Sequence, residues 1–225
     1  MQPVAFFLLL LILIEVNFVE FFSHIMTVFA KGGLVMYPLM LCSVLVITIA
    51  IERSLYLRNS RTDVNALLTV LAEPLGAGNW EKAGQICENS RGVPAQMLAE
   101  ALHQPFADRC QFEQILDGVA ASVATLLRYR LDYLETIVTL APLLGLLGTV
   151  AGMIMSFSVL NLKSEQPLAI TGGVGEALVA TATGLTVAIA ALIAHSHLSH
   201  RVNAIIADME KAANQVVQRI PGRAV

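Results

Sequence analysis

The chain has few charged residues for its length. Asp, Glu, Lys and Arg make up 14% of its 225 residues, against about 25% in a typical soluble domain. The formal net charge is only −3 and no basic patch alternates with aromatic residues, which argues against a nucleic-acid partner. Apolar residues reach 56%, above the roughly 45–50% of soluble domains, and the mean hydropathy is +0.69. This is the composition of a membrane protein.

Residue patterns that carry metal or enzyme chemistry are also scarce. The chain has three cysteines, Cys42, Cys87 and Cys110, and their spacings match no metal or redox motif. We interpret them as reduced small hydrophobic residues. The sequence has no phosphate loop and no nucleophile–base pair. His195, His197 and His200 cluster without a Cys or acidic ligand, so solvated interfacial histidines are favoured over a metal site. We therefore expect no enzyme activity, no metal and no cofactor.

Long apolar runs are what the sequence does have. Three are long enough to cross a bilayer, which needs roughly 17–25 residues per helix: 34–51, 137–162 and 174–194. The fold class predicted is an all-α membrane protein with three transmembrane helices, two of which extend into a helical cytoplasmic domain.

Residues 1–30 contain a shorter apolar run, from Val4 to Ile14. No Lys or Arg precedes it, and Glu15 and Glu20 follow it where a small-residue cleavage site would be expected in a signal peptide. We favour an uncleaved helix lying in the membrane interface, with a cleaved signal as the alternative.

Residues 52–136 form the water-exposed helical domain. A first helix is expected from Thr62, ended by Pro74, and Asn79 can cap a second from Trp80 to Glu88. Pro94 suits the first turn of a third. A long amphipathic helix is expected from about Gln111. No Pro or Gly between Gly118 and Pro142 interrupts it, so it can run straight into the second span. Its predicted buried face is Ile115, Val119, Ser122/Val123, Leu126 and Tyr133.

The placement of Lys and Arg predicts the orientation. Residues 52–135 carry eight of them and the tail, 195–225, carries four. The segment before the first span has only Lys31, and the connection 163–173 has only Lys163. The positive-inside rule puts the N-terminus and this connection in the periplasm, and the domain and the helical tail in the cytoplasm.

Glu176 is the candidate of greatest interest, because an ionised group at bilayer depth costs roughly 2–4 kcal/mol or more. The simpler alternative is that Glu176 lies near the outer membrane interface, where the free-energy cost of its charge is small. Thr183 is seven residues on and shares its face, whereas Thr181 points about 140° away. A threonine alone commonly bonds its own helix, so its functional meaning rests on context.

The second span has a face of small residues at helical spacing, which predicts close packing against another helix or another copy: Gly145, Gly148, Gly152 and Ser156. Gly184 continues this small-residue character in the third span. Thr149 lies seven residues before Ser156, nearly on one line with it. Pro142, earlier in the second span, is expected to kink it.

Two motifs resemble a known family. Ala141-Pro142-Leu143-Leu144-Gly145-Leu146-Leu147-Gly148-Thr149-Val150-Ala151-Gly152-Met153 is similar to the second-span signature of the MotA/TolQ/ExbB proton-channel family. The stretch from Gly175 to Leu185 is similar to its third-span signature. The first span, with Gly32-Gly33 before it and Glu52-Arg53 at its end, resembles the ExbB branch, with TolQ next.

The resemblance implies a homopentamer in the bacterial inner membrane whose second and third spans line a pore. It implies an ExbD/TolR-type partner with one span and an intramembrane Asp, and a TonB- or TolA-type protein that receives the work. Thr149 and Thr181 match the family's pore-lining threonines and Glu176 its third-span glutamate. The remaining residues named in the two spans, Thr183 and Gly184 included, would line the pore or pack the helices.

Two alternatives stay open. The chain could serve a TolQ-like role in envelope maintenance, or it could be a membrane scaffold that conducts no ion. A scaffold would tolerate changes at Thr149 and Glu176 and be sensitive over residues 60–130 instead. The sequence favours H⁺ over Na⁺ slightly, because no further intramembrane carboxylate is present.

Overall fold

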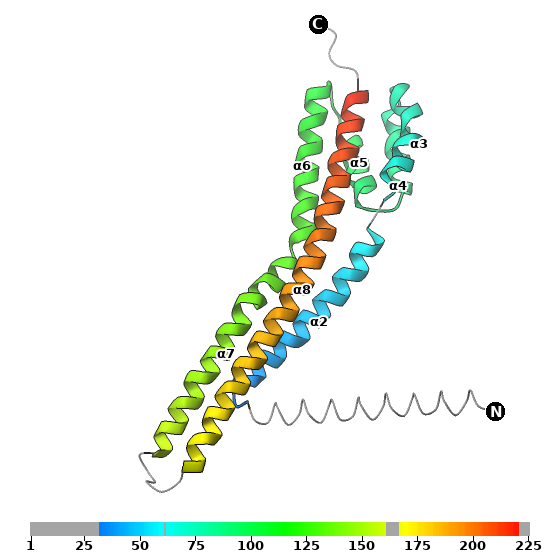
Figure 1. Cartoon of the computed structure of the whole chain (residues 1–225). Helices are drawn as coiled ribbons and strands as arrows, with labels where there is room; N and C mark the ends of the chain where they lie inside the picture. The colour runs from blue at the N-terminus through cyan, green and yellow to red at the C-terminus, as the bar shows by residue number, and fades with distance from the viewer. Residues whose placement is uncertain (1–31, 61, 161–166, 221–225) are drawn as a thin grey trace, which may run out of the picture. The chain divides into compact units, whose positions relative to one another are not determined.

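A computed structural model describes residues 32–60, 62–160 and 167–220. Every regular element in these ranges is a helix, which confirms the predicted all-α class (Figure 1). The expected interfacial helix or signal in residues 1–30 lies outside the described residues. The helices are α2 (Met36–Asn59), α3 (Val64–Gly76), α4 (Trp80–Asn89), α5 (Val93–Leu102), α6 (Arg109–Arg128), α7 (Leu131–Leu160) and α8 (Pro167–Arg219).

Three of the long helical stretches are apolar enough to cross a membrane, as predicted. Their most apolar windows fall in α2, in α7 and in α8, with mean hydropathies of 1.8, 2.1 and 2.2. Less than a third of each window is buried within the chain, so most of their apolar surface is free to meet lipid or other subunits.

The first compact unit contains residues up to Leu45 and residues Ile137–Ala191. It holds the start of α2, most of α7 and the first half of α8. The buried contact between α7 and α8, called the seam below, consists mostly of small residues: Ala141, Ser156, Ala177, Ala180, Ala188 and Ala191. The long apolar side chains of the same helices, such as Leu146 and Leu178, point outward at 58% and 65% exposure.

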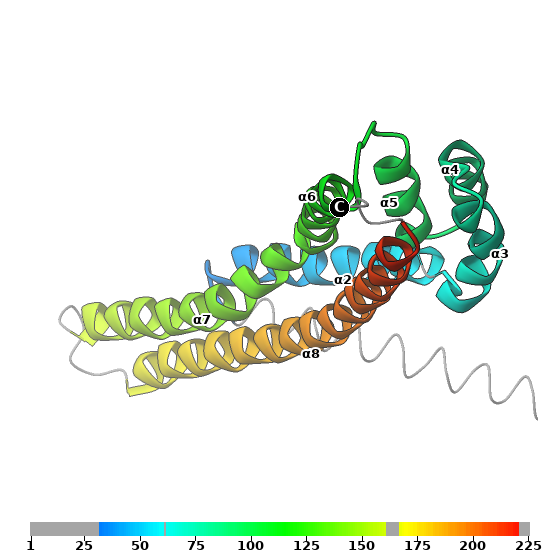
Figure 2. The same ribbon diagram turned by 90° about the horizontal axis from the view of Figure 1, so that it is seen from above.

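The second unit contains Val46–Thr136 and Leu192–Val225. Within it α3, α4 and α5 follow one another as short helices (Figure 2). Asp63 and Asp108 cap α3 and α6 with their carboxylates, and Asn79 caps α4 by accepting from the Lys82 N–H at 3.0 Å, as predicted. The core is aliphatic, with one aromatic cluster in which Phe106 lies against both Trp80 and Phe112.

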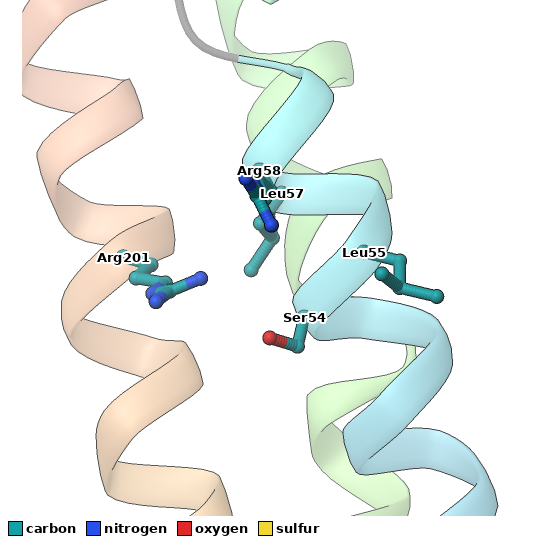
Figure 3. A pocket seen from close by; sticks show the side chains of 5 residues that line it. All are labelled: Ser54, Leu55, Leu57, Arg58 and Arg201. Atoms are coloured by element: carbon teal, nitrogen blue, oxygen red, sulfur yellow. The ribbon is translucent and has the colours of Figure 1, made fainter.

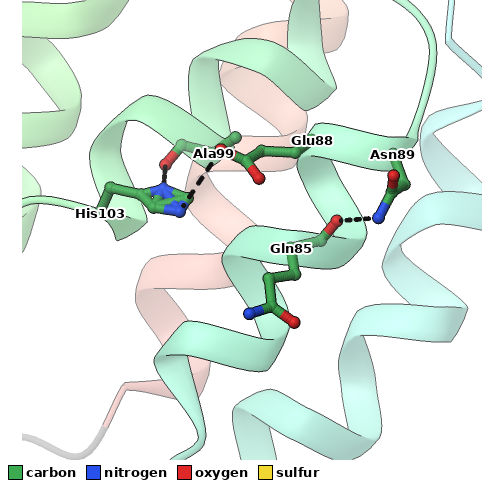
Figure 4. A network of polar contacts seen from close by, with 5 residues as sticks. All are labelled: Gln85, Glu88, Asn89, Ala99 and His103. Atoms are coloured by element: carbon green, nitrogen blue, oxygen red, sulfur yellow. Dashed lines mark hydrogen bonds and ion pairs between the residues drawn. The ribbon is translucent and has the colours of Figure 1, made fainter.

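A polar contact fixes α5 to α4. The imidazole of His103, the residue that ends α5, lies 3.2 Å from the Ala99 carbonyl through Nδ1 and 3.6 Å from Glu88 through Nε2 (Figure 4). Gly84 of α4 leaves room for this ring, since a β-carbon there would lie 3.2 Å from His103 Cε1. Nearby, the Asn89 side chain donates to the Gln85 carbonyl at 2.9 Å.

The structure differs from the sequence predictions in the long amphipathic helix. Its buried face is Phe112, Leu116, Val119 and Leu127, whereas the predicted face included Leu126 and Tyr133, which are 66% and 52% exposed. The helix also stops at Arg128 and restarts at Leu131 instead of running straight on.

The break between α6 and α7 is held by side chains. Arg130 pairs with Glu52 of α2. Tyr129 packs edge-on against Tyr133 with ring centroids 6.0 Å apart, within the roughly 4.5–7 Å typical of aromatic pairs. The two residues of the break are therefore anchored from both sides. The Arg130–Glu52 pair joins segments far apart in the chain, and the local pattern carried no sign of it.

Pro74 and Pro167 lie inside helices, and Pro74 was predicted to end its helix. The first short helix continues through Pro74 to Gly76, because Pro74 and Leu75 are buried in the unit's core and that burial outweighs one lost backbone bond. The connection predicted over residues 163–173 is helical from Pro167, where α8 begins. Proline is well suited to a first helical turn, where its missing N–H costs nothing.

Candidate ion pathway

The predicted glycine face of α7 packs against α8. A β-carbon at Gly148 would lie 2.5 Å from Ala180 Cβ, and one at Gly152 would lie 3.2 Å from Ala177 Cβ. One at Gly145 would lie 3.1 Å from Thr181 Cα, which is backbone that cannot rotate away. The absence of side chains therefore brings the two backbones into contact, the arrangement that small residues favour between membrane helices.

The same seam continues at both ends. A β-carbon at Gly184 would lie 2.6 Å from the Ala141 carbonyl oxygen and 3.0 Å from Gly145 Cα. At the other end, Ser156 is buried, contacts Gly173 and donates to its own helix at the Gly152 carbonyl, 2.9 Å away. α7 and α8 are thus antiparallel and in contact over about four turns.

Pro142 lies inside this contact, next to the buried Ala141. It is half-buried, and α7 is helical on both sides of it from Leu131 to Leu160. The interruption in this part of the chain falls instead at Tyr129–Arg130, well before the proline.

Thr181 makes a side-chain hydrogen bond between the two spans. Its hydroxyl donates to the Gly145 carbonyl of α7 at 3.1 Å and is partly buried. Gly145 permits this approach, because any side chain there would meet the Thr181 backbone. Thr181 therefore joins the helices directly and sets their register.

Thr149 and Thr183 bond within their own helices. The Thr149 hydroxyl donates to the Leu146 carbonyl three residues back, at 2.6 Å. The Thr183 hydroxyl donates to Val179 four residues back, at 2.8 Å, which is the ordinary behaviour of a threonine in a helix. Thr149 differs in position, because it sits on α7 between Gly145, at the level of Thr181, and Gly152, at the level of Ala177.

Glu176 lies against Gly33, which precedes α2. A β-carbon at Gly33 would collide with a carboxylate oxygen of Glu176, which would have to move. Gly33 also has a φ of +69°, a conformation that side-chain-bearing residues rarely adopt. Glu176 is half-buried, so its charge meets the backbone at the start of α2 instead of lipid.

These contacts show which two directions the polar groups of α8 face within the chain. Thr181 points to α7 and Glu176 to the start of α2, in keeping with the angle of about 140° between them. The five residues from Glu176 to Thr181 rise roughly 7–8 Å along a helix, so the three candidate residues occupy about two turns of one helix pair. Hydroxyls in such a site can pass a proton or a hydrated ion while only Glu176 carries charge.

Three residues of the site were not predicted. Gly33, Ala141 and Gly173 each provide a close contact to α8 or α7. Gly173 could have been found, because it stands four residues before Ala177 and extends the same small face. Ala141 could have been found in the same way, because it stands four residues before Gly145. Gly33 gave no such signal, since its contact joins distant parts of the chain.

The sequence of the chain matches known proteins. Residues 89–211, more than half of the chain, match the MotA/TolQ/ExbB proton channel family. Both motif-bearing spans lie inside the match.

Individual relatives agree with it. The chain is 37% identical over 174 residues to "Putative biopolymer transport protein ExbB-like 1" of Synechocystis, covering 73% of this chain and 66% of that protein. It is 35% identical to "Putative biopolymer transport protein ExbB-like 3" of the same organism, covering 72% and 79%. A shorter match, 42% over 83 residues and 36% of each chain, is to "Tol-Pal system protein TolQ" of Haemophilus influenzae. The chain belongs to the MotA/TolQ/ExbB proton channel family, as its second- and third-span motifs predicted.

Proposed function

We propose that the chain is an ExbB-like subunit of an ion-driven motor in the inner membrane. Five copies form a ring around a dimer of an ExbD-type single-span partner, and the ring uses proton flow to energise a TonB-type protein. The observation that carries the proposal is the α7–α8 pair, which places Thr149, Thr181 and Glu176 within about two helical turns of each other in segments apolar enough to span. Membership of a proton channel family supports it.

The proton-carrying charge is assigned to the partner. Within this chain Glu176 is held against Gly33, and the hydroxyl of Thr181 is used in packing. Thr149 is then the residue best placed to exchange a hydrogen bond with an ion or with a partner's carboxyl group, because its hydroxyl bonds only its own helix at the edge of the seam. Glu176 positions α8 against α2, and Thr181 positions α8 against α7.

The energetics require more than one ion per step. One charge crossing 100 mV supplies roughly 2.3 kcal/mol, so several crossings are needed for mechanical work. A subunit built from tightly packed α7 and α8 can deliver such work, because close-packed helices move as one body instead of deforming.

The proposed orientation has the N-terminus and the connection 163–173 in the periplasm, and residues 52–136 and the tail in the cytoplasm. The support is the distribution of Lys and Arg, with eight of them in residues 52–135. The arginines of this domain include Arg53, Arg58 and Arg130, which all lie close behind the apolar part of α2 or before that of α7.

A TolQ-like role in envelope maintenance is the second candidate, favoured by the match to a Tol-Pal system protein over 36% of the chain. Its partners would be TolR- and TolA-type proteins. Deleting this chain's gene separates the two roles: loss of TonB-type uptake supports the ExbB-like role, and loss of envelope integrity with normal uptake supports the TolQ-like role.

The experiment that separates a motor from a scaffold uses two single variants in cells, Thr149→Ala and Glu176→Ala. The motor proposal expects the membrane complex to keep its mass while partner-dependent function is lost. The matched control is Thr186→Ala, which removes an exposed hydroxyl that bonds its own helix at Ala182. Normal function in both test variants, with loss of function from changes within residues 60–130, would establish the scaffold instead.

A further inference from the structure

A pocket with two arginines lies between α2 and α8 in the second unit. Its volume is about 410 Å³ and it is lined by Ser54, Leu55, Leu57 and Arg58 of α2 and by Arg201 of α8. Arg201 reaches from α8 toward α2, and the Ser54 hydroxyl points into the space between the helices, whereas Leu55 points away (Figure 3). Cationic and hydroxyl donors from two helices therefore converge on one space.

The positive charge of this pocket is not neutralised within the chain. Neither Arg58 nor Arg201 forms an ion pair with any residue that the structure describes. Glu52, the nearest acidic residue along α2, is already paired with Arg130. Arg53, the residue before Ser54, does not line the pocket; it is only 7% exposed and its guanidinium lies over the Tyr56 ring, 5.3 Å from the centroid. The local potential favours an anion.

Ser54 is also unlike most other hydroxyl residues in the helices. Ser60 and Thr125, for example, donate to carbonyls of their own helix at 2.8 and 2.9 Å. Ser54 makes no hydrogen bond to any part of the protein that the structure covers, and its hydroxyl remains available to a ligand in the pocket. Two guanidinium groups and a hydroxyl are the donors that suit a phosphate group, which Arg can bind with two parallel hydrogen bonds.

The position of the pocket along the helices indicates the source of that phosphate. Ser54 and Arg58 stand three and seven residues beyond Ile51, the last apolar residue of the first span. Arg201 stands seven residues beyond Ala194, the end of the third. At 1.5 Å per residue these positions lie roughly 5–10 Å past the apolar segments, which is the depth of the headgroup layer.

We propose that this pocket binds the headgroup phosphate of an anionic phospholipid. Arg58 and Arg201 hold the phosphate oxygens, Ser54 donates a further hydrogen bond, and the acyl chains run along the apolar surface of α2 past Ile51 and Ile47, which are each 57% exposed. The proposal rests on the spans and the pocket and is independent of ion conduction. A ring without conduction would bind the lipid equally well.

The test is native mass spectrometry of the full chain, purified from nanodiscs that contain equal amounts of phosphatidylglycerol and phosphatidylcholine. The wild-type chain is expected to retain phosphatidylglycerol selectively. Each basic residue beside an anionic headgroup contributes a factor of roughly five in affinity, so Arg58→Gln with Arg201→Gln should lower that retention roughly thirtyfold. Arg58→Lys with Arg201→Lys keeps the charge and should lower it much less.

The matched control is Arg109→Gln with Arg128→Gln. It removes the same charge from exposed arginines outside the pocket, one of them nine residues before Ile137. Equal loss of lipid in the control and test variants would overturn the proposal, because it would show a general charge effect. Displacement of the lipid by excess inorganic phosphate would also overturn it, in favour of a soluble phosphate ligand. Unchanged lipid retention in Arg58→Gln with Arg201→Gln would also overturn it, because the two arginines would then not hold the lipid.

Discussion

Replacing Gly184 by alanine is expected to force α7 and α8 apart. The added β-carbon would lie 2.6 Å from the Ala141 carbonyl oxygen and 3.0 Å from Gly145 Cα. Ordinary contact begins at 3.4 Å, so the helices must separate by about 0.8 Å at this level. Both neighbours are backbone atoms, and no rotamer change can relieve the contact.

The magnitude follows from these contacts. Overpacking a close-packed site costs roughly 1–3 kcal/mol, and the upper end applies here because only a helix shift can accommodate the methyl group. Against this, alanine is favoured over glycine in a helix by up to about 1 kcal/mol. Gly175→Ala measures that second effect alone, since a β-carbon at Gly175 in the same helix would meet nothing within 4 Å.

The assay is chemical unfolding of the purified chain in detergent, followed by circular dichroism. Gly184→Ala should unfold more readily than the wild type by roughly 2–3 kcal/mol, and Gly175→Ala should be at least as stable as the wild type. If both variants behave alike, α7 and α8 are not in backbone contact at Gly184, and the helix pair described above is wrong.

Two further predictions concern single side chains. Thr181→Val keeps the shape of the side chain but removes its donation to the Gly145 carbonyl, so it should destabilise the chain by about 0.5–1 kcal/mol in the same unfolding assay. Thr181→Ser should restore most of the loss. Equal stability of the valine and serine variants would show that the bond contributes nothing. Burial raises the pKa of Cys87 to about 12, above its ordinary value of 9.0, so the folded state favours the neutral thiol. That contribution to stability is complete below the pKa of the unfolded state and is lost as the pH rises toward the pKa of the folded state, so the chain should become less stable above about pH 9. At pH 8.5 a thiol reagent should label the exposed Cys110, while Cys87 reacts only on unfolding. Prompt labelling of Cys87 would contradict its burial.

The sequence predicted the packing face of α7 because that information is local. Gly145, Gly148 and Gly152 share a face by helical spacing alone, whatever they meet. The partner of each glycine depends on the register between two helices, which spacing within one helix does not contain. The contact of Gly184 with Ala141 is therefore seen only in the structure.

The errors have the same origin. The buried face of α6 was misplaced because Leu126 and Tyr133 fit the helical period, while the break at Tyr129–Arg130 ends the helix between them. Beside that break, Arg130 pairs with Glu52, which is 78 residues away in the chain. Similarly, Glu176 was recognised as a costly charge, but its contact with Gly33 joins segments that local reasoning treats separately.

Proton flux measures the central proposal most directly. The chain would be reconstituted with its single-span partner in liposomes, and an interior pH dye would follow an imposed membrane potential. Wild type and Thr186→Ala should conduct, whereas Thr149→Ala should lose most of the flux while keeping the mass of the complex. Full flux through Thr149→Ala, or no flux through the intact wild-type complex, would contradict a proton path along α7 and α8.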